Sequence, residues 1–326
     1  MSGRRLSAVV PTLGASPYLE RCLAALRDDA GAAVEIVLVA QEGSAARLRP
    51  RLGGLVDRWV ALDDNLGFAG GTDRGVAVCA APWIATVNDD AIVEPGWSGR
   101  LLAALDADPR AGAAQGVVLR LAAPGEVDGR GLAWNRWWQA VQLGHGEAAP
   151  AAGEGEAAAP AEVFGVSATA AVYRRAALAA AALPGGAVFD PALGSWYEDA
   201  DLANRLRAAG WRALSVPAAI ALHAGTTTGE RAGWRRWAMV AGNRHLVVAR
   251  LLGRLYGREL GRMLLRDLAD AGRAAAEGGA GRALGMAAGW ARAARRMPRY
   301  AHRGAPRVPL AEVHRLRAEA GSSDPN

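Results

Sequence analysis

The chain has 326 residues, 51% of them apolar, which is enough for one large domain with a packed core or for a domain with an appendage. Its 38 basic residues are all arginine: residues 1–229 carry 19 against 24 acidic residues, net −5, and residues 230–326 carry 19 against 8, net +11. The chain is therefore globular, and its last third suits an anionic surface such as a membrane leaflet or a nucleic acid.

Local composition excludes several further classes. Cys22 and Cys79 lie far apart in segments with helical spacing, so neither a disulfide framework nor a cysteine metal site is indicated. The apolar stretch that follows the N-terminus is too short for a signal peptide, and no run of about 18 uncharged apolar residues predicts a transmembrane helix. We therefore expect a cytoplasmic protein.

Strands and helices alternate over the first ninety residues. Apolar runs typical of buried strands occur at Leu6–Pro11, Val34–Ala40, Trp59–Leu62 and Trp83–Val87. Helices are expected between them at Pro17–Leu26, after Ser44, and at Gly70–Ala80. Because alternation of this length implies right-handed crossovers, the sequence predicts an α/β fold with a mostly parallel sheet.

After residue 90 the pattern is less regular. Helices are expected at Trp97–Leu105, Arg174–Leu183 and Glu198–Ala209. Strand-like runs occur at Ala113–Leu121, Val163–Tyr173, Trp211–Val216 and Ala219–His223. The segment from about 145 to 162 is almost entirely Ala, Gly, Glu and Pro, which predicts a flexible loop.

Residues 230–326 are helical and basic in pattern. Arginines recur every four residues from Arg250 to Arg266, with leucines between them, which predicts an amphipathic helix. Such a helix could lie on an anionic membrane, or it could pack on the catalytic core with a solvated arginine face. Nucleic acid is not expected as a partner because no aromatic side chains are interleaved with the arginines.

Two carboxylates and an amide follow the strand that ends at Val87. Asn88, Asp89 and Asp90 come where the carboxyl ends of parallel strands meet, the usual edge for ligands in an open α/β sheet. Oxygen ligands of this kind bind Mg²⁺ or Mn²⁺, often together with substrate phosphates. A polar turn that ends the strand explains the same residues about equally well.

Three other features are candidates for the same site. Asn65–Gly71 is a glycine-rich turn without the spacing of a dinucleotide fingerprint, so it rules out a dehydrogenase and predicts either ligand contact or a helix start. Glu198 and Asp199 open a helix, where carboxylates act as caps or, kept ionised by the helix field, as a general base. His223 ends an apolar strand and is either an ordinary histidine or a ligand.

Taken together, these segments resemble the inverting glycosyltransferases of family 2, which have the GT-A fold, and among them the rhamnosyltransferase-like branch. The resemblance runs from about Leu6 to Thr228. The motifs that carry it are Val9-Val10-Pro11-Thr12, Asn65 to Gly71, Asn88-Asp89-Asp90 with Val93 to Trp97, Glu198 to Leu202, Arg207 to Trp211, and His223-Ala224-Gly225.

The resemblance implies a role for each matching residue. Asp199, paired with Glu198, would be the catalytic base that deprotonates the acceptor hydroxyl. The divalent metal, Mg²⁺ or Mn²⁺, would be held by Asp90, Asn88 and His223. The nucleotide-sugar donor would be bound by Pro11, Thr12, Gln41, Asn65, Gly67, Gly70, Gly71, Asn88 and Asp89.

The resemblance also implies a domain organisation. Residues 1–229 would form the catalytic domain, with a nucleotide-binding half to about residue 120 and an acceptor half after it, followed by the helical region 230–326. Three positions depart from the family's pattern: Gln41 lies nearest the place of an aspartate that reads the base, Leu13-Gly14 replace an aromatic residue and Asn, and Asn88 replaces an acidic metal ligand.

We therefore expect a metal-dependent transferase that moves a sugar from a dTDP- or UDP-sugar, such as dTDP-rhamnose, to a hydroxyl of a glycan or lipid-linked acceptor. Its place would be the cytoplasm, in peripheral contact with the inner face of the membrane. Two alternatives remain. One is a catalytically silent binding or assembly subunit, suggested by Gln41 and Asn88, and the other is a nucleotidyltransferase on a related sheet, which would release pyrophosphate.

Overall fold

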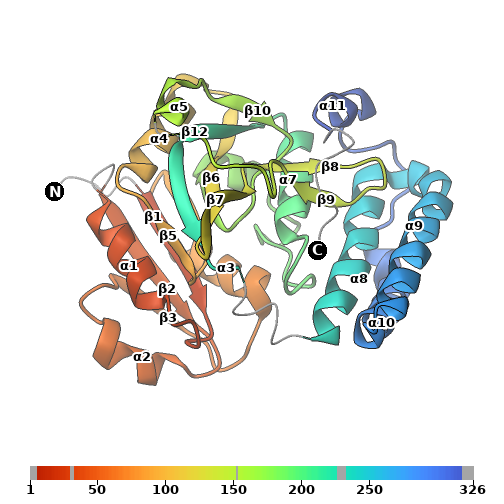
Figure 1. Ribbon diagram of the computed structural model, residues 1–326, viewed down its shortest axis with the longest axis horizontal. Coiled ribbons are helices and arrows are strands. Elements are labelled where there is room, and N and C mark those ends of the chain that lie inside the picture. Colours follow the sequence, from red (N-terminus) through yellow and green to blue (C-terminus); the bar gives the residue numbers. More distant parts are fainter. Residues whose placement is uncertain (1–5, 30–32, 152, 226–232, 318–326) are drawn as a thin grey trace.

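A computed structural model describes residues 6–29, 33–151, 153–225 and 233–317. It is built around one mixed sheet with helices on both faces and a group of helices beside it (Figure 1). The boundary expected at residues 229–230 and the last residues of the matching segment, 226–228, lie outside the described residues.

The sheet begins with a parallel half. β1 (Leu6–Thr12) pairs in parallel with β2 (Val34–Ala40) and with β4 (Trp83–Val87), and β2 pairs with β3 (Arg58–Ala61). Helices α1 (Leu19–Asp28), α2 (Ala45–Leu52) and α3 (Gly67–Val78) connect these strands. The expected α/β alternation is confirmed, and the observed bounds of β2 and β4 are those expected from the sequence.

The second half adds antiparallel pairing. β11 (Ala170–Arg174) runs antiparallel between β4 and β6 (Ala111–Arg120), and β12 (Arg212–His223) runs parallel to β6. Consequently β4, β6 and β12 point the same way, and their carboxyl ends meet at one edge. The remaining elements of this part of the chain are α4 (Trp97–Ala107), β5 (Ala91–Val93), β7 (Ala123–Gly129), α5 (Glu154–Ala157), β10 (Ala161–Val163), α6 (Arg175–Ala180) and α7 (Glu198–Ala208). β8 (Leu132–Trp134) and β9 (Ala140–Gln142) pair with each other in a separate two-stranded sheet.

Several elements differ from the sequence-based expectation. The run 163–173 is divided between β10 and β11, and the two β segments after residue 211 form the single strand β12, whose register shifts between Val216 and Ile220. The expected loop 145–162 contains α5. β5 and β7 were not expected from the sequence, because neither shows clear apolar alternation of its own. β5 is held by pairing with the distant strand β12, and β7 by pairing with the preceding strand β6.

Alternation along the strands gives the sheet two apolar faces. Val10 and Leu38 pack with residues of α1, α2 and α4, while Val9 and Val39 pack with residues of α3, α6 and α7. This is the pattern of strands that are buried on both sides. The site residues at the strand ends are therefore held by a rigid scaffold.

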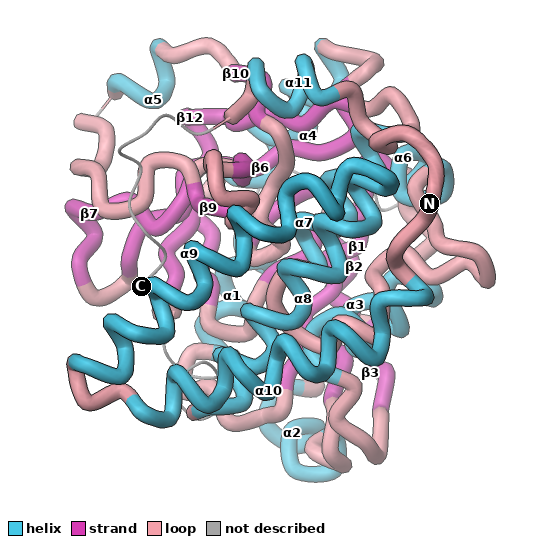
Figure 2. The backbone as a smooth tube through the Cα atoms, turned by 90° about the vertical axis from the view of Figure 1, so that its right-hand side faces the viewer, coloured by secondary structure: helices cyan, strands magenta, loops and turns pink. Residues whose placement is uncertain are grey.

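The C-terminal region packs on this scaffold through α8 (Trp234–Leu252). Leu246, Val247 and Leu251 share a cluster with Trp134, Trp138 and Phe164. α9 (Tyr256–Ala276) and α10 (Ala280–Arg296) lie beside α8 (Figure 2), and the short α11 (Leu310–Arg315) follows. In the described part of the chain no helix has the length and apolar character needed to cross a membrane.

The expectation of one amphipathic helix from Arg250 to Arg266 is wrong. α8 ends at Leu252, and Gly253, with φ +53°, begins a 3-10 turn before α9. A side chain is strained at that φ, and a Cβ there would lie 2.5 Å from the Gly304 carbonyl oxygen. Arg250 is buried and forms ion pairs with Asp190 (2.7 Å) and Asp201 (2.6 Å), so it belongs to the core.

Candidate active site

Asp89 links the turn after β4 to the loop after β1. The Thr12 hydroxyl donates to Asp89 Oδ2 at 2.5 Å, and Ser16 donates to the Asp89 carbonyl oxygen at 3.0 Å. Burial raises the pKa of Asp89 to about 6, although the Thr12 hydrogen bond acts in the opposite direction. Asp89 therefore holds the loop at Pro11–Thr12 in place, and its neighbour Asp90 contacts His223 instead.

Asp90 and Asn88 meet His223 at the shared strand edge. His223 Nε2 lies 3.3 Å from Asp90 Oδ1 and 3.3 Å from Asn88 Nδ2, because His223 pairs with Ala91 across β12 and β5. His223 Nδ1 lies 2.8 Å from Asp128 Oδ2 on β7. Burial opposes the charged imidazole, but the two carboxylates prevail and raise the pKa of His223 to about 9.

This donor set suits a divalent cation. If a cation displaces the Nε2 proton of His223 while Asp128 keeps the proton on Nδ1, the lone pair of Nε2 points to the side of Asp90 and Asn88, as in a carboxylate–histidine–metal arrangement. Within the described ranges no three His, Cys, Asp or Glu side chains converge on a common metal position. A cation at Asp90 and His223 would therefore need further oxygen ligands from a substrate diphosphate or water.

The glycine-rich stretch contacts the loop that precedes α7. The Ala69 N–H donates to the Gly194 carbonyl oxygen at 2.8 Å, and the Phe68 N–H donates to Ser195 Oγ at 3.1 Å. Gly67 has φ +71°, and a Cβ there would lie 2.5 Å from the Gly194 oxygen. The approach of the two backbones is the physical reason for a glycine at this position.

Gln41 supports the glycine-rich stretch from the end of β2. Its Oε1 accepts the Leu66 N–H at 2.8 Å, and its Nε2 donates to the Gly67 carbonyl oxygen at 3.3 Å. A Cβ on Gly71 would lie 2.7 Å from Gln41 Nε2, so Gly71 is buried against this amide. Both ends of the Gln41 amide are engaged within the protein.

Glu198 and Asp199 begin α7 after two strained residues, Trp196 (φ +65°) and Tyr197 (φ +70°). Burial raises the pKa of Glu198 well above its usual range, and the adjacent Asp199 charge raises it further. Burial also raises the pKa of Asp199, against hydrogen bonds that include those from the N–H groups of Ala200 and Ala168. Desolvation thus acts against the helix field that is expected to keep Asp199 ionised, and ionisation of Asp199 at neutral pH stays a prediction.

A buried asparagine on α8 holds this strained loop. Asn243 Nδ2 lies 2.9, 3.0 and 2.8 Å from the carbonyl oxygens of Leu193, Ser195 and Trp196. Its Oδ1 accepts from Arg292 on α10, which also donates to the Ala192 carbonyl oxygen at 2.9 Å. The conformation that presents Glu198 and Asp199 is thus fixed by the C-terminal helices.

One cleft of about 1470 Å³ brings these groups together. The residues expected from the sequence that line it are Pro11, Thr12, Gln41, Asn65, Gly67, Gly70, Asn88, Asp89, Asp90, Glu198, Asp199 and His223. Gly71 is buried behind Gln41 instead. Within the described chain, Glu198 Oε2 is buried without a hydrogen-bond partner.

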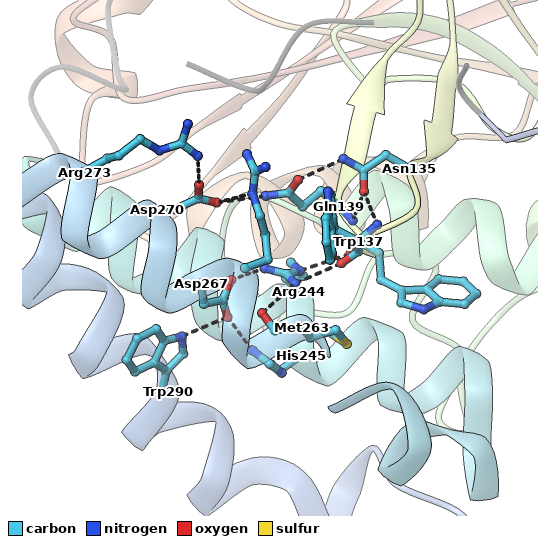
Figure 3. Close-up of polar contacts among 12 residues, drawn as sticks. Asn135, Trp137, Gln139, Arg244, His245, Met263, Asp267, Asp270, Arg273 and Trp290 are labelled. Carbon is cyan, nitrogen blue, oxygen red and sulfur yellow. Dashed lines mark hydrogen bonds and ion pairs between the residues drawn. The ribbon is translucent and has the colours of Figure 1, made fainter. Parts of the chain in front are cut away.

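The far wall of the cleft comes from the C-terminal helices, which the sequence did not place there. Asp267 on α9 accepts hydrogen bonds from Arg244, His245 and Trp290, and Arg244 donates to the carbonyl oxygens of Trp137 (3.0 Å) and Trp138 (3.1 Å) (Figure 3). This buried network ties α8, α9 and α10 to the β8–β9 turn. The wall is therefore rigid.

Comparisons with known proteins concern the family and the fold of the chain. The model of a family described as Glycosyltransferase like family 2 matches residues 4–241. Solved structures with similar folds include GalNAc-T7 with UDP, GalNAc and Mn²⁺ (TM-score 0.56, 14% identity, 78% of this chain and 49% of that one) and Staphylococcus aureus TarS (TM-score 0.47, 14% identity, 75% of this chain and 42% of that one). The chain thus spans about half the length of these structures, and no curated protein sequence matches it.

Proposed function

Because this match covers most of the chain, the protein belongs to glycosyltransferase family 2 and has the GT-A fold, and we propose that it is a metal-dependent, inverting member. It moves a sugar from a nucleotide-diphosphosugar, a dTDP- or UDP-sugar such as dTDP-rhamnose, to a hydroxyl of a glycan or lipid-linked acceptor. The observation that carries this proposal is that Asp90 with His223 and Glu198 with Asp199 face one cleft.

In the proposed reaction Asp199 removes the proton of the acceptor hydroxyl. The acceptor oxygen then forms a bond to the anomeric carbon while the bond from that carbon to the nucleoside diphosphate breaks. A buried carboxylate with a raised pKa is a stronger base than an exposed one, which suits Asp199 to this step. The bound cation supplies electrostatic stabilisation of the leaving diphosphate.

The residues near Asp90 shape the part of the cleft that would bind the nucleotide-sugar donor. Asp128 orients the His223 ring so that Nε2 faces Asp90, and Thr12 and Asp89 fix the loop beside the donor. Gln41 and Asn65 shape the glycine-rich stretch, where Asn65 Oδ1 accepts the Gly67 N–H at 2.9 Å. The Mn²⁺ and UDP in the GalNAc-T7 structure support a metal and a nucleotide for this fold.

A peripheral contact with an anionic membrane remains part of the proposal. The described helices expose Trp234 (52%), Leu265 (69%), Leu268 (57%) and Leu284 (70%). Arg258 and Arg262, exposed on α9, would meet anionic headgroups. Residues 1–229 are proposed as the catalytic domain and 230–326 as a helical region attached to it.

The test is nucleoside-diphosphate release from a panel of UDP-, dTDP- and GDP-sugars, dTDP-rhamnose among them, with Mn²⁺ or Mg²⁺. Release that requires both the metal and the Asp199 carboxylate is expected. Pyrophosphate release would indicate a nucleotidyltransferase instead, and release of neither product with any donor would contradict the proposed reaction.

A further inference from the structure

A glutamine is buried in the sheet at a position where an apolar side chain would cost less free energy to bury. Gln115 lies on β6, which pairs with β11 on one side and β12 on the other, and it is fully buried. Its Oε1 accepts the Ser167 N–H at 2.6 Å, and its Nε2 donates to the Gly129 carbonyl oxygen at 3.4 Å. The two ends of one amide therefore reach two segments that are 38 residues apart in the sequence.

The first of these segments, Ser167–Thr169, contacts both the proposed base and the turn after β4. Asp199 accepts hydrogen bonds from the Ala168 N–H and the Ser167 hydroxyl. The Thr169 carbonyl oxygen accepts the Asn88 N–H at 2.8 Å. All three residues of the segment line the cleft. A shift of this segment would therefore move groups that touch Asp199.

The second segment is a bulge in β7. Consecutive residues of β6 pair with Gly129 and Val127, so Asp128 is left out of the β6–β7 register. A bulge of this kind changes the direction of a side chain, and Asp128 Oδ2 lies 2.8 Å from His223 Nδ1. The hydrogen bond from Gln115 thus holds the backbone next to the residue that orients His223.

Resting on the proposed function, we propose that Gln115 is a positioning residue that couples the base side of the cleft to its metal side. Through Ser167 it fixes the segment that contacts Asp199. Through Gly129 it fixes the strand that orients His223. Gln115 is not among the described residues that line the cleft, so it acts through these two segments and touches no substrate itself.

Gln115→Met tests the coupling, because methionine has a similar length and makes neither hydrogen bond. The two assays are kcat for nucleoside-diphosphate release and calorimetric binding of UDP and dTDP with and without Mn²⁺. We expect kcat to fall about 10-fold and Mn²⁺-dependent nucleotide binding to weaken about 10-fold. Each side is also changed alone: Ser167→Ala should lower kcat and leave nucleotide binding intact, whereas Asp128→Ala should mainly weaken binding.

Two further variants control for folding. Gln115→Asn has an amide one methylene shorter, which cannot keep both bonds, and it should give the same loss in both assays. Val117→Ala is the matched control, since Val117 is buried on the same face of β6, two residues further on. It should lower stability in urea and leave kcat and nucleotide binding near the wild-type values.

The outcomes separate this inference from the function on which it rests. Folded Gln115→Met and Gln115→Asn enzymes that change only one of the two assays, or neither, would overturn the coupling and leave the proposed function standing. A loss in both assays that Val117→Ala shows equally would assign Gln115 to stability alone. Wild-type enzyme with neither nucleoside-diphosphate release nor Mn²⁺-dependent nucleotide binding would overturn the proposed function, and this inference with it.

Discussion

Asn243→Ala should impair both stability and turnover, because one buried amide holds the loop that leads into the proposed catalytic carboxylates. Asn243 is fully buried, its Nδ2 is within 3.0 Å of three carbonyl oxygens, and its Oδ1 accepts from Arg292. The substitution removes a donor from the Ser195 and Trp196 carbonyl oxygens and an acceptor from Arg292, whereas the Leu193 oxygen keeps a contact with Arg292. At about 1–3 kcal/mol for each of the two or three groups that lose a real partner, we expect a loss of about 3–5 kcal/mol.

Turnover should fall for a separate reason. Trp196 and Tyr197 hold positive φ values that cost about 1–3 kcal/mol each and persist only while their surroundings enforce them. Without the Asn243 hydrogen bonds the loop relaxes and displaces Glu198 and Asp199. A displacement of about 1 Å in a reacting group can lower kcat about 100-fold, so a loss of at least about 10-fold is expected, with donor binding retained.

Urea unfolding and steady-state kinetics separate the two effects. The kinetics are measured under conditions below the unfolding midpoint of each variant, so that only folded enzyme is compared. Asp29→Ala is the matched control, since Asp29 is also buried and its oxygens accept the Gly96 and Ser98 N–H groups at 2.9 Å, outside the residues that line the cleft. It should cost stability and leave kcat near the wild-type value. A folded Asn243→Ala enzyme with wild-type kcat would refute the argument that α8 positions the catalytic pair.

Asp199→Asn should lower kcat about 100-fold or more while calorimetry still detects donor binding, and near-normal turnover would remove Asp199 from the role of base. Asp90→Asn should abolish Mn²⁺-dependent nucleotide binding, and unchanged binding would place the cation elsewhere. The raised pKa values of Glu198 and Asp199 predict that kcat falls with decreasing pH at a higher pH than for an exposed carboxylate, and Glu198→Gln should change the pH of that fall, since adjacent carboxyls titrate as a pair. In EDTA, the raised pKa of His223, about 9 against 6.5 when unfolded, gives stability that is complete below pH 6.5 and lost toward pH 9; the loss is about 3 kcal/mol, and His223→Gln should not show it in urea titrations at each pH.

Local pattern was enough to predict the parallel half of the fold and the edge where the site lies. β2 and β4 are continuous apolar runs with short polar turns, and the residues after them need no distant information to be placed at the strand ends. Glu198 opens α7 as expected, since acidic residues favour a helix start. The chemical roles of Asp90 and Asp199 stay predictions.

The parts that sequence could not predict depend on contacts between distant segments. Asp128 lies on a strand that exists through its pairing with β6, so no local signal marked it as the partner of His223. Asn243 is one polar residue in a helix, and nothing in its neighbours indicates the loop it holds, nearly fifty residues earlier. In the sequence Arg250 is one of a regular series of arginines that suggests a solvated face. Its two buried partners, Asp190 and Asp201, are far away in the sequence and are identified only in the structure.

The contacts of α8 and α10 with the loop before α7 also affect the order in which the chain folds during synthesis. Asn243 and Arg292 are synthesised long after Asp199, so a growing chain can complete the sheet while the residues before α7 still lack their contacts with α8 and α10. If Glu198 and Asp199 act as proposed, a polypeptide interrupted before α10 is expected to bind its donor without transferring the sugar.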